Sequence, residues 1–363
     1  MTEAKRAPRF GVEEEFLLLD AETGRPRDGS DAIIAALPEL RAEHEFFHSQ
    51  LETATPICDT ADEAIGSLRE FRVAASREAR RNGLVLSGAG LPPLGGEIPG
   101  TVVDTKRYVD INRTMRGMVS RYYSTGTHVH VEVPSRDAGI DAVARIAPWT
   151  PLLIALTANS PVWLGDETGY ASWRYLSLQQ WPSSGYPPHF ASAEEYDRVV
   201  DGLVDAGALL DRALVNWSIR LSAKFPTIEI RLADAQLSSE EAVAYALIYR
   251  ALVARALREG AAGTEFEPAQ PDILRGASWL AARNGLASEL VDPRTWRPGA
   301  AAEVLDALLD HVGEDLSDAG DLARVEGYLA ARKRDGGPAE RQLAAWRAGG
   351  IAGLLGVYDA AGD

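Results

Sequence analysis

Cysteine and positive charge are both scarce in this chain of 363 residues. Cys58 is the only cysteine, so the chain can build neither a disulfide framework nor a zinc site of four cysteines. Acidic residues outnumber basic ones by 53 to 37, and the resulting net charge of −16 argues against a broad nucleic-acid or anionic-membrane surface. Because Cys58 lies in TPICDT, just before an expected helix, we expect it to be a small core residue.

Long uncharged apolar runs are missing as well. The stretch MTEAKRAPRFGVEEEF at the amino end contains no apolar run of signal-peptide length. The most apolar later segment, PWTPLLIALTANSPVW, contains three prolines and is short for a membrane span. These features favour a soluble, cytoplasmic protein that has no membrane or nucleic-acid partner.

Several common catalytic motifs are also absent. The chain has no GxxxxGK[ST] phosphate loop and no GxGxxG after a strand, and the glycine-rich GAGLPPLGG matches neither pattern. No GxSxG nucleophile elbow occurs either. A nucleotide would therefore have to be bound by something other than a glycine-rich phosphate loop.

The elements that are present indicate an α+β fold. Expected strands cover residues 10–20, 49–57, 84–90, 124–134 and 226–234. Expected helices cover residues 60–82, 139–158, 192–214 and 238–259, and most of 270–363. The first begins with a capping box at 60–63, and the second is broken at its prolines. A long loop spans 159–191. Because the strands alternate between polar and apolar residues, we predict a mainly antiparallel sheet with one polar face, within a single α+β domain over 1–363.

The polar face of the predicted sheet carries an unusual set of side chains. In STGTHVHVEVP, residues 124–134, alternation places two histidines and a glutamate on one face and valines on the other. Two further strands show the same alternation, and a fourth can join them. The set comprises Glu13 and Glu15, His128, His130 and Glu132, Glu229 and Arg231, with Glu52 and Gln50 beside them. Since unpaired charges on a covered face cost free energy, a divalent ion such as Mg²⁺ or Mn²⁺ would offset that cost.

Simpler explanations exist for each part of this set. A pair of glutamates two residues apart is usually a solvated strand face, and isolated histidines often only hydrogen-bond within a fold. The loop over 159–191 contains Trp163, Trp173, Trp181 and Arg174. We expect the tryptophans to pin the loop down, whereas Arg174 is suited to hold a carboxylate or phosphate in a bidentate manner.

Taken together, the motifs resemble those of a known family. Six segments resemble, in the same order along the chain, the signature segments of the type 2 glutamate–cysteine ligases. They are FGVEEEFLLLD, SQLETATPIC, GTHVHVEVP, NSPVW followed by TGYAS-x-R, QQWPSSGYPP and TIEIRLAD. ARNGL, LVDP and GGPAERQ resemble the carboxylate–amine ligase branch of that family. The resemblance implies a fold like the catalytic domain of glutamine synthetase, in which a curved antiparallel sheet forms a funnel and helices pack outside it.

The resemblance also implies a reaction. ATP with Mg²⁺ would phosphorylate the γ-carboxylate of glutamate or a similar acid, and an amine such as cysteine would attack the acyl phosphate. The positions that match family metal ligands are Glu13, Glu15, Glu52, His128 and Glu229, with His130 as a further ligand. Arg231 would steady the transferring γ-phosphoryl group, and Arg174 would grip a substrate carboxylate or phosphate. The resemblance further suggests a homodimer.

Two residues depart from the family pattern, and two other functions stay open. Glu132 stands where a small residue is expected, and Glu167 stands where relatives carry aspartate. One alternative function is a metal-dependent hydrolase that uses the HxH strand. The other is a catalytically silent protein that binds ATP or a metabolite. The acceptor amine is not readable from the sequence.

Overall fold

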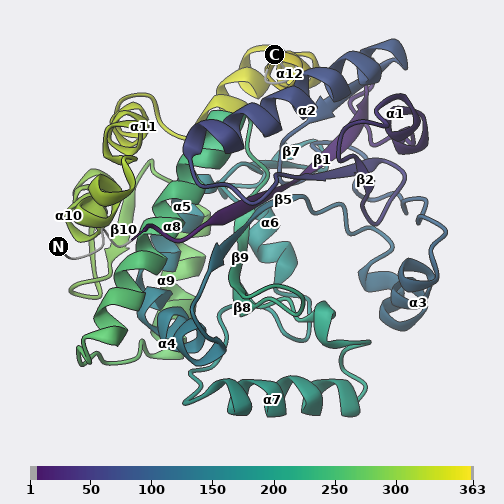
Figure 1. Ribbon diagram of the computed structural model, residues 1–363. Helices are drawn as coiled ribbons and strands as arrows, with labels where there is room; N and C mark the ends of the chain where they lie inside the picture. Colours follow the sequence, from purple (N-terminus) through teal and green to yellow (C-terminus); the bar gives the residue numbers. More distant parts are fainter. Residues whose placement is uncertain (1–5, 361–363) are drawn as a thin grey trace.

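The computed structural model describes residues 6–360, which form one large antiparallel sheet surrounded by helices (Figure 1). The seven strands of this sheet run in the order β2-β3-β1-β5-β9-β8, and β4 also pairs with β1. Their bounds are β1 Phe10–Asp20, β2 Glu43–His44, β3 Gln50–Ala54, β4 Leu84–Ser87, β5 Gly126–Glu132, β8 Ile219–Leu221 and β9 Thr227–Asp234. All pairings between these strands are antiparallel, so the predicted fold class is confirmed.

Helices surround the sheet, and some of them cover its apolar face. The helices are α1 Ser30–Ala36, α2 Ala61–Arg81, α3 Lys106–Met115, α4 Arg136–Ile146, α5 Thr150–Thr157, α6 Trp173–Leu178, α7 Ala193–Asp205, α8 Ser239–Ala261, α9 Pro271–Asn284, α10 Ala301–Ala319, α11 Leu322–Asp335 and α12 Pro338–Ala360. Of these, α2 and α8 pack on β1, and α4 packs on β8 and β9. Alternate residues of β1 therefore face the helices, as Phe16 does against Phe71 of α2, with ring centroids 5.7 Å apart.

Local signals explain most helix boundaries. Thr60 and Glu63 form the capping box at the start of α2, and Ser238 accepts a hydrogen bond from the Glu241 backbone at the start of α8. The helix expected over 139–158 is divided by a 3₁₀ turn, Ala147–Trp149, at the first of its prolines. The combined stretch Arg136–Thr157 is long and apolar enough to cross a membrane, but 83% of its most apolar window is buried inside the protein.

Several predicted boundaries were wrong. The helix that starts after Ser192 ends at Asp205 rather than at 214, because Gly207 adopts a left-handed φ of 72°. By contrast, α8 continues past Gly260, where an added Cβ would lie 2.4 Å from Asp141 of α4, so this glycine permits close packing instead of ending the helix. The second strand is shorter than expected, at Gln50–Ala54. The expected loop over 159–191 contains α6 and the two-stranded sheet of β6 Val162–Trp163 and β7 Asp166–Glu167.

The carboxy-terminal helices pack on the rest of the protein. Helix α12 lies beside β4, and α10 and α11 contact α8. The predicted helical character of this portion is broken only by the hairpin of β10 Glu289–Asp292 and β11 Arg297–Ala300 within the described residues. A buried polar chain ties α12 to the sheet: Tyr358 donates to Gln342 at 2.7 Å, and Gln342 donates to the Asn159 side chain at 2.5 Å. The Asn159 backbone N–H in turn donates to Asp234 at the end of β9, at 2.8 Å.

Candidate active site

A cavity of about 530 Å³ opens on the polar face of the sheet, and we call it the funnel. It is lined by the eight residues to which the family resemblance or their own chemistry assigned a site role: Glu13, Glu15, Glu52, His128, His130, Arg174, Glu229 and Arg231. Gln50 and Glu132, which were placed on the same polar face, do not line it. Side chains that were not nominated also line it, among them Glu43, Glu45, Tyr108, Arg220 and Lys224. The structure thus brings the nominated residues together, while the role of each remains a prediction.

Strand register explains this convergence. Residues directly opposite each other in an antiparallel pair point to the same face. The opposed pairs, from one edge of the sheet to the other, are Glu43 and Glu52, Glu52 and Glu15, Glu13 and His128, His130 and Glu229, and Glu229 and Arg220. The polar face is therefore one continuous row of side chains across six strands.

Histidines and glutamates contact one another in the middle of this row. Nε2 of His130 lies 3.5 Å from Oε1 of Glu13 and 3.9 Å from Oε2 of Glu229. One ligand atom from each of these three residues lies within 4.8 Å of the others, which suits a shared cation. His128 is buried and lies 3.6 Å from both Glu13 and Glu15. Burial opposes the ionisation of Glu13, but hydrogen bonds from His128 and His130 hold its pKa well below the usual value.

One end of the row is basic. The Arg220 guanidinium donates to both oxygens of Glu229, at 2.8 and 3.2 Å, and Arg231 donates to Glu229 and lies 3.3 Å from Nδ1 of His128. Burial disfavours the Glu229 carboxylate, yet the two arginines hold its pKa far below the ordinary value. The β5–β9 register shifts between Thr127 and Val129, and this irregularity lies beside Arg231.

The other end of the row is acidic and poorly neutralised. Burial and the nearby charge of Glu15 raise the pKa of Glu45 to about 8. Burial and the charge of Glu45 raise the pKa of Glu52 well above its usual value. The ionised forms of these two carboxyl groups would therefore repel one another in the absence of a cation, and a divalent ion bound here would relieve that repulsion.

Arg174 is buried more deeply than its predicted role requires. Its Nη1 donates to the Ala233 carbonyl at 2.9 Å and lies 3.8 Å from the Asp234 carboxylate, and only 2% of the residue is exposed. A Cβ at Gly126 would lie 2.3 Å from its Nη2, so the glycine makes room for the guanidinium. Nε of Arg174 is buried and has no hydrogen-bond partner within residues 6–360. Arg174 thus braces β5 against β9 at the funnel, and its contact with a ligand stays a prediction.

The remaining nominated features lie at the rim or in the core. Glu132 pairs with Arg9 at 2.8 Å, and Glu167 pairs with Arg347 at 2.6 Å, so both departures from the family pattern form half-exposed ion pairs outside the funnel. Cys58 is buried, as predicted. Trp181 is buried against Tyr122, with ring centroids 5.4 Å apart, and so helps to pin its loop.

Sequence reasoning missed Glu45 and Arg220. Glu45 follows the two-residue strand β2, and Glu43 and Glu45 alternate with apolar or aromatic neighbours in EHEFFH. Arg220 stands between Ile219 and Leu221, which repeats the alternation seen in TIEIRLAD. The same period of two residues would have found both residues if strands of two or three residues had been considered.

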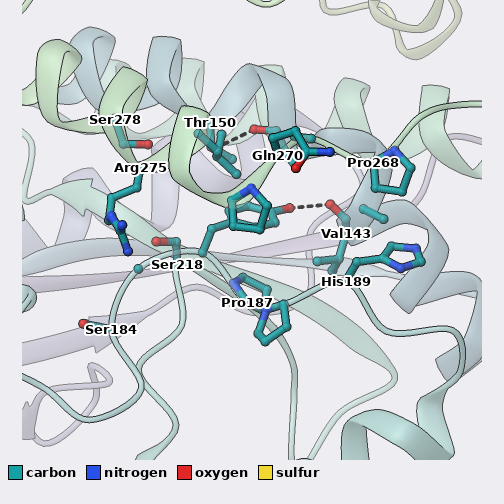
Figure 2. Close-up of a pocket in the computed structure, with 18 of the residues that line it drawn as sticks. Val143, Thr150, Ser184, Pro187, His189, Ser218, Pro268, Gln270, Arg275 and Ser278 are labelled. Carbon is teal, nitrogen blue, oxygen red and sulfur yellow. Dashed lines mark hydrogen bonds between the residues drawn. The ribbon is translucent and has the colours of Figure 1, made fainter.

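A second cavity of about 530 Å³ adjoins the funnel (Figure 2). The two cavities share four lining residues: Tyr175, Gln179, Gly185 and Ser218. Figure 2 shows Arg275 and Ser278 at one end of this cavity and His189 and Pro268 at the other. Much of the lining between them is apolar and comes from α4, α5 and α9. A ligand in the funnel therefore has an apolar chamber beside it.

Comparison with known proteins identifies both the fold and the family. The fold is that of solved glutamate–cysteine ligases: the enzyme from Francisella tularensis in complex with AMP superposes with a TM-score of 0.75 at 15% identity, covering 99% of this chain and 89% of that one. A bifunctional glutathione synthetase from Pasteurella multocida gives a TM-score of 0.72 at 17% identity, covering 99% of this chain and 53% of that one.

Sequence similarity narrows the assignment. The sequence model of glutamate–cysteine ligase family 2 (GCS2) matches residues 9–355, and the chain belongs to this family. The protein named "Putative glutamate–cysteine ligase 2-2" of Saccharopolyspora erythraea is 40% identical over 374 residues, covering 99% of this chain and 95% of that protein.

Proposed function

We propose that this protein is an ATP-dependent carboxylate–amine ligase that activates the γ-carboxylate of glutamate, or of a similar acid, as an acyl phosphate. The observation that carries the proposal is the row of opposed side chains in the funnel, which runs from an acidic end at Glu52 to a basic end at Arg220. Relatives named as glutamate–cysteine ligases and a structural neighbour that holds AMP support the same chemistry.

The chemistry needs both ends of the row. A free carboxylate is a poor acyl donor, because an oxide leaving group is too basic, so a phosphate must first replace it as the leaving group. Phosphoryl transfer depends mainly on positioning and on neutralisation of charge. Arg231 borders the funnel and carries a fixed positive charge, which Glu229 orients and stabilises although burial opposes it. In this proposal Arg231 binds the transferring phosphoryl group, and Arg220 holds Glu229 in place.

The donor set of the funnel fits Mg²⁺. Carboxylate oxygens are the ligands that this hard ion prefers, and the raised pKa values of Glu45 and Glu52 mark a place where added positive charge stabilises the ionised forms. Because Mg²⁺ takes only six ligands and usually keeps several waters, these donors would be divided between more than one ion. The residues from which the ligands would come are Glu13, Glu15, Glu45, Glu52, His128, His130 and Glu229. Bound Mg²⁺ would neutralise phosphate charge and help to orient the nucleotide. Glu229 differs from the others because its oxygens already bond to two guanidinium groups.

The proposal is tested by trapping the activated acid. Purified protein is incubated with ATP, Mg²⁺, glutamate and hydroxylamine, which intercepts an acyl phosphate as a hydroxamate without requiring the natural amine. We expect ADP release and γ-glutamyl hydroxamate, both of which Arg231→Lys should reduce strongly because lysine lacks the planar fork. An absence of ADP and hydroxamate with glutamate and with a panel of other carboxylic acids would contradict the proposal.

The acceptor amine is then identified by replacing hydroxylamine with a panel of amines and detecting new amides by mass. Cysteine belongs in this panel because of the family. Amines with apolar or aromatic side chains also belong there, because the neighbouring chamber at Tyr175 and Gln179 offers them room. We also propose that the chain acts as a single catalytic unit, since one hydrophobic cluster extends from Phe10 to Tyr358.

The metal-dependent hydrolase remains a second candidate because Glu13, His130 and Glu229 form a compact set of donors. It predicts tight, stoichiometric zinc in the funnel and hydrolytic activity without ATP. Zinc analysis of the protein with and without His130→Ala, which removes a funnel donor, together with the hydroxylamine assay, distinguishes the two functions.

A further inference from the structure

A second group of metal-binding side chains lies outside the funnel, where α1 meets β2 and the loop that follows it. Asp31 lies in the first turn of α1, His44 ends β2, and His48 lies in the loop before β3. One ligand atom from each of these residues lies within 4.8 Å of the others. We call this group the His–His–Asp cluster.

Two distances within the cluster are close to those between neighbouring ligands of one metal ion. His44 Nε2 lies 3.1 Å from Oδ1 of Asp31, and His48 Nδ1 lies 3.3 Å from Oδ2 of Asp31. Zinc–nitrogen and zinc–oxygen bonds of about 2.0–2.1 Å in a tetrahedral site place neighbouring ligand atoms about 3.3 Å apart. The two histidines contact different oxygens of Asp31, and one ligand atom from each residue lies within 4.8 Å of the others, so the side chains would move closer together to coordinate one ion.

Hydrogen bonding around the cluster also favours a cation. Nδ1 of His44 lies 2.9 Å from Oγ of the buried Ser30, which fixes the ring and leaves Nε2 facing Asp31. Nδ1 of His48 is shielded from solvent and has no hydrogen-bond partner among residues 6–360, although it lies beside the Asp31 carboxylate. A buried nitrogen left without a partner is costly, and a metal ion would satisfy it.

The backbone holds the cluster in place before any ion binds. The His48 carbonyl accepts hydrogen bonds from the backbone N–H groups of Gly29 and Ser30, both at 3.0 Å, and its own N–H donates to Thr101 at 2.9 Å. The Asp31 side chain is 71% exposed, so the open side of the cluster is accessible to an ion from solution and to water as a further ligand. The ligands are thus preorganised and reachable.

We propose that Asp31, His44 and His48 form a binding site for one borderline divalent cation of the Zn²⁺ or Co²⁺ type, separate from the Mg²⁺ chemistry of the funnel. Two imidazoles and one carboxylate select such an ion over Mg²⁺, which prefers an all-oxygen shell. The site does not depend on the proposed ligase activity.

Occupancy of this site would stiffen one wall of the funnel. His44 and His48 flank Glu45, and Glu43 precedes His44, so the segment that holds the ion also presents two of the funnel glutamates. The backbone of His44 is paired with Leu51 of β3, one residue before Glu52. An ion bound outside would therefore restrict the motion of the acidic end of the row.

The test is a titration of the metal-free protein with Co²⁺ and then Zn²⁺, in millimolar Mg²⁺. The parent protein of this titration carries His130→Ala, and every other variant carries this change as well. The change prevents Glu13, His130 and Glu229 from competing for the ion. We expect one equivalent of Co²⁺ with intense visible absorption typical of a low-coordinate site, displaced by Zn²⁺. Asp31→Asn and His48→Gln should each weaken Zn²⁺ binding by at least about 10–100-fold. Loss of a residue that only hydrogen-bonds to a metal ligand already has an effect of that size, and these changes remove a ligand itself.

His189→Ala is the matched control, because His189 is an exposed histidine outside both groups, and it should leave the titration unchanged. Far-ultraviolet circular dichroism checks that the variants fold, and Asp31→Asn alters only an exposed side chain. Hydrogen exchange of residues 43–50 should slow with Zn²⁺ in the parent and not in Asp31→Asn. Equal Zn²⁺ affinity in the parent, Asp31→Asn and His48→Gln, or no equivalent bound by the parent, would overturn the proposal.

Discussion

The two faces of strand β1 treat the same residue type in opposite ways. Glu13, Glu14 and Glu15 are consecutive, but Glu14 points to the helix-covered face and the other two point into the funnel. Glu14 is 1% exposed and receives two hydrogen bonds from Arg72 of α2, at 2.5 and 2.9 Å. Arg72 uses its remaining N–H groups on the Gln236 and Leu237 carbonyls, at 2.9 and 3.0 Å.

This difference shows that one strand can carry a glutamate for stability on one face and glutamates of the candidate site on the other. On the helix side, the protein supplies the cation itself, and every polar group of the Glu14–Arg72 pair has a partner. On the funnel side, His128 and His130 hold the pKa of Glu13 low. Glu45 and Glu52, which line the funnel from outside β1, keep raised pKa values because neighbouring carboxylates add to the effect of burial. The helix face is complete without a ligand, whereas the funnel face is prepared for positive charge from outside.

The largest effect should follow from removing the buried ion pair on the helix-covered face of β1. Arg72→Ala leaves Glu14 buried without its cation, and we expect the free energy of unfolding to fall by about 3–5 kcal/mol. Urea denaturation monitored by circular dichroism measures the change. A loss below about 1 kcal/mol would mean that the pair contributes no more than a surface ion pair.

Removing a carboxylate from the funnel face should instead lower activity strongly and leave stability unchanged or higher. Glu52→Gln should lower kcat/KM by about 100-fold, which corresponds to about 2.7 kcal/mol of transition-state stabilisation. The same change should leave the metal-free protein as stable as the parent or more stable, because it removes repulsion with Glu45. Steady-state kinetics with hydroxylamine and urea denaturation in EDTA measure the two effects. Full activity in Glu52→Gln would remove this residue from the proposed metal site.

The open face should also give the metal-free protein a distinct pH dependence. The pKa of Glu45 is raised from 4.5 to about 8, so between these values the folded chain holds a proton that the unfolded chain has lost. The free energy of unfolding should therefore decrease as the pH rises through this window. Glu45→Gln should flatten the decrease, and Mg²⁺ should oppose it in the parent. Denaturation midpoints in EDTA from pH 5 to 9 test this, and identical profiles for parent and Glu45→Gln would contradict it.

The smallest effect should come from the exposed end of β5. Glu132 belongs to the same strand face as His128 and His130, but its ion pair with Arg9 leaves the two side chains 38% and 40% exposed. We expect Arg9→Ala to change the free energy of unfolding by only about 0–1 kcal/mol and kcat/KM by less than twofold. Together with Arg72→Ala, this variant separates the effect of burial from that of charge. A stability loss equal to that of Arg72→Ala would show that burial is not what distinguishes them.

The sequence predicted the sheet and most of the funnel because both depend on a local period. Alternation along residues 10–20, 124–134 and 226–234 is enough to place Glu13, His128 and Glu229 on one face of their strands. The family resemblance then implied that these strands meet in one funnel-shaped sheet. Neither step required knowledge of contacts between distant residues.

What the sequence could not show depends on long-range packing. Glu14 meets Arg72, which lies 58 residues away, so its ion pair has no local signature. The two cavities share residues from different loops, and the brace formed by Arg174 depends on carbonyls of β9. Glu45 directly follows β2 and Arg220 lies in β8, and both strands are so short that alternation alone barely marks them.

The polar chain from Tyr358 through Gln342 and Asn159 to Asp234 also bears on the order of events during synthesis. A ribosome releases the chain from its amino end, so β1, β5 and β9 emerge long before α12. Until Gln342 leaves the exit tunnel, the side-chain oxygen of Asn159 lacks the hydrogen bond that Gln342 donates. The hydrogen-bond chain that holds Asp234, at the end of β9, is then incomplete. The nascent protein therefore carries the charged side chains of β1, β5 and β9 before Gln342 can complete this chain of hydrogen bonds.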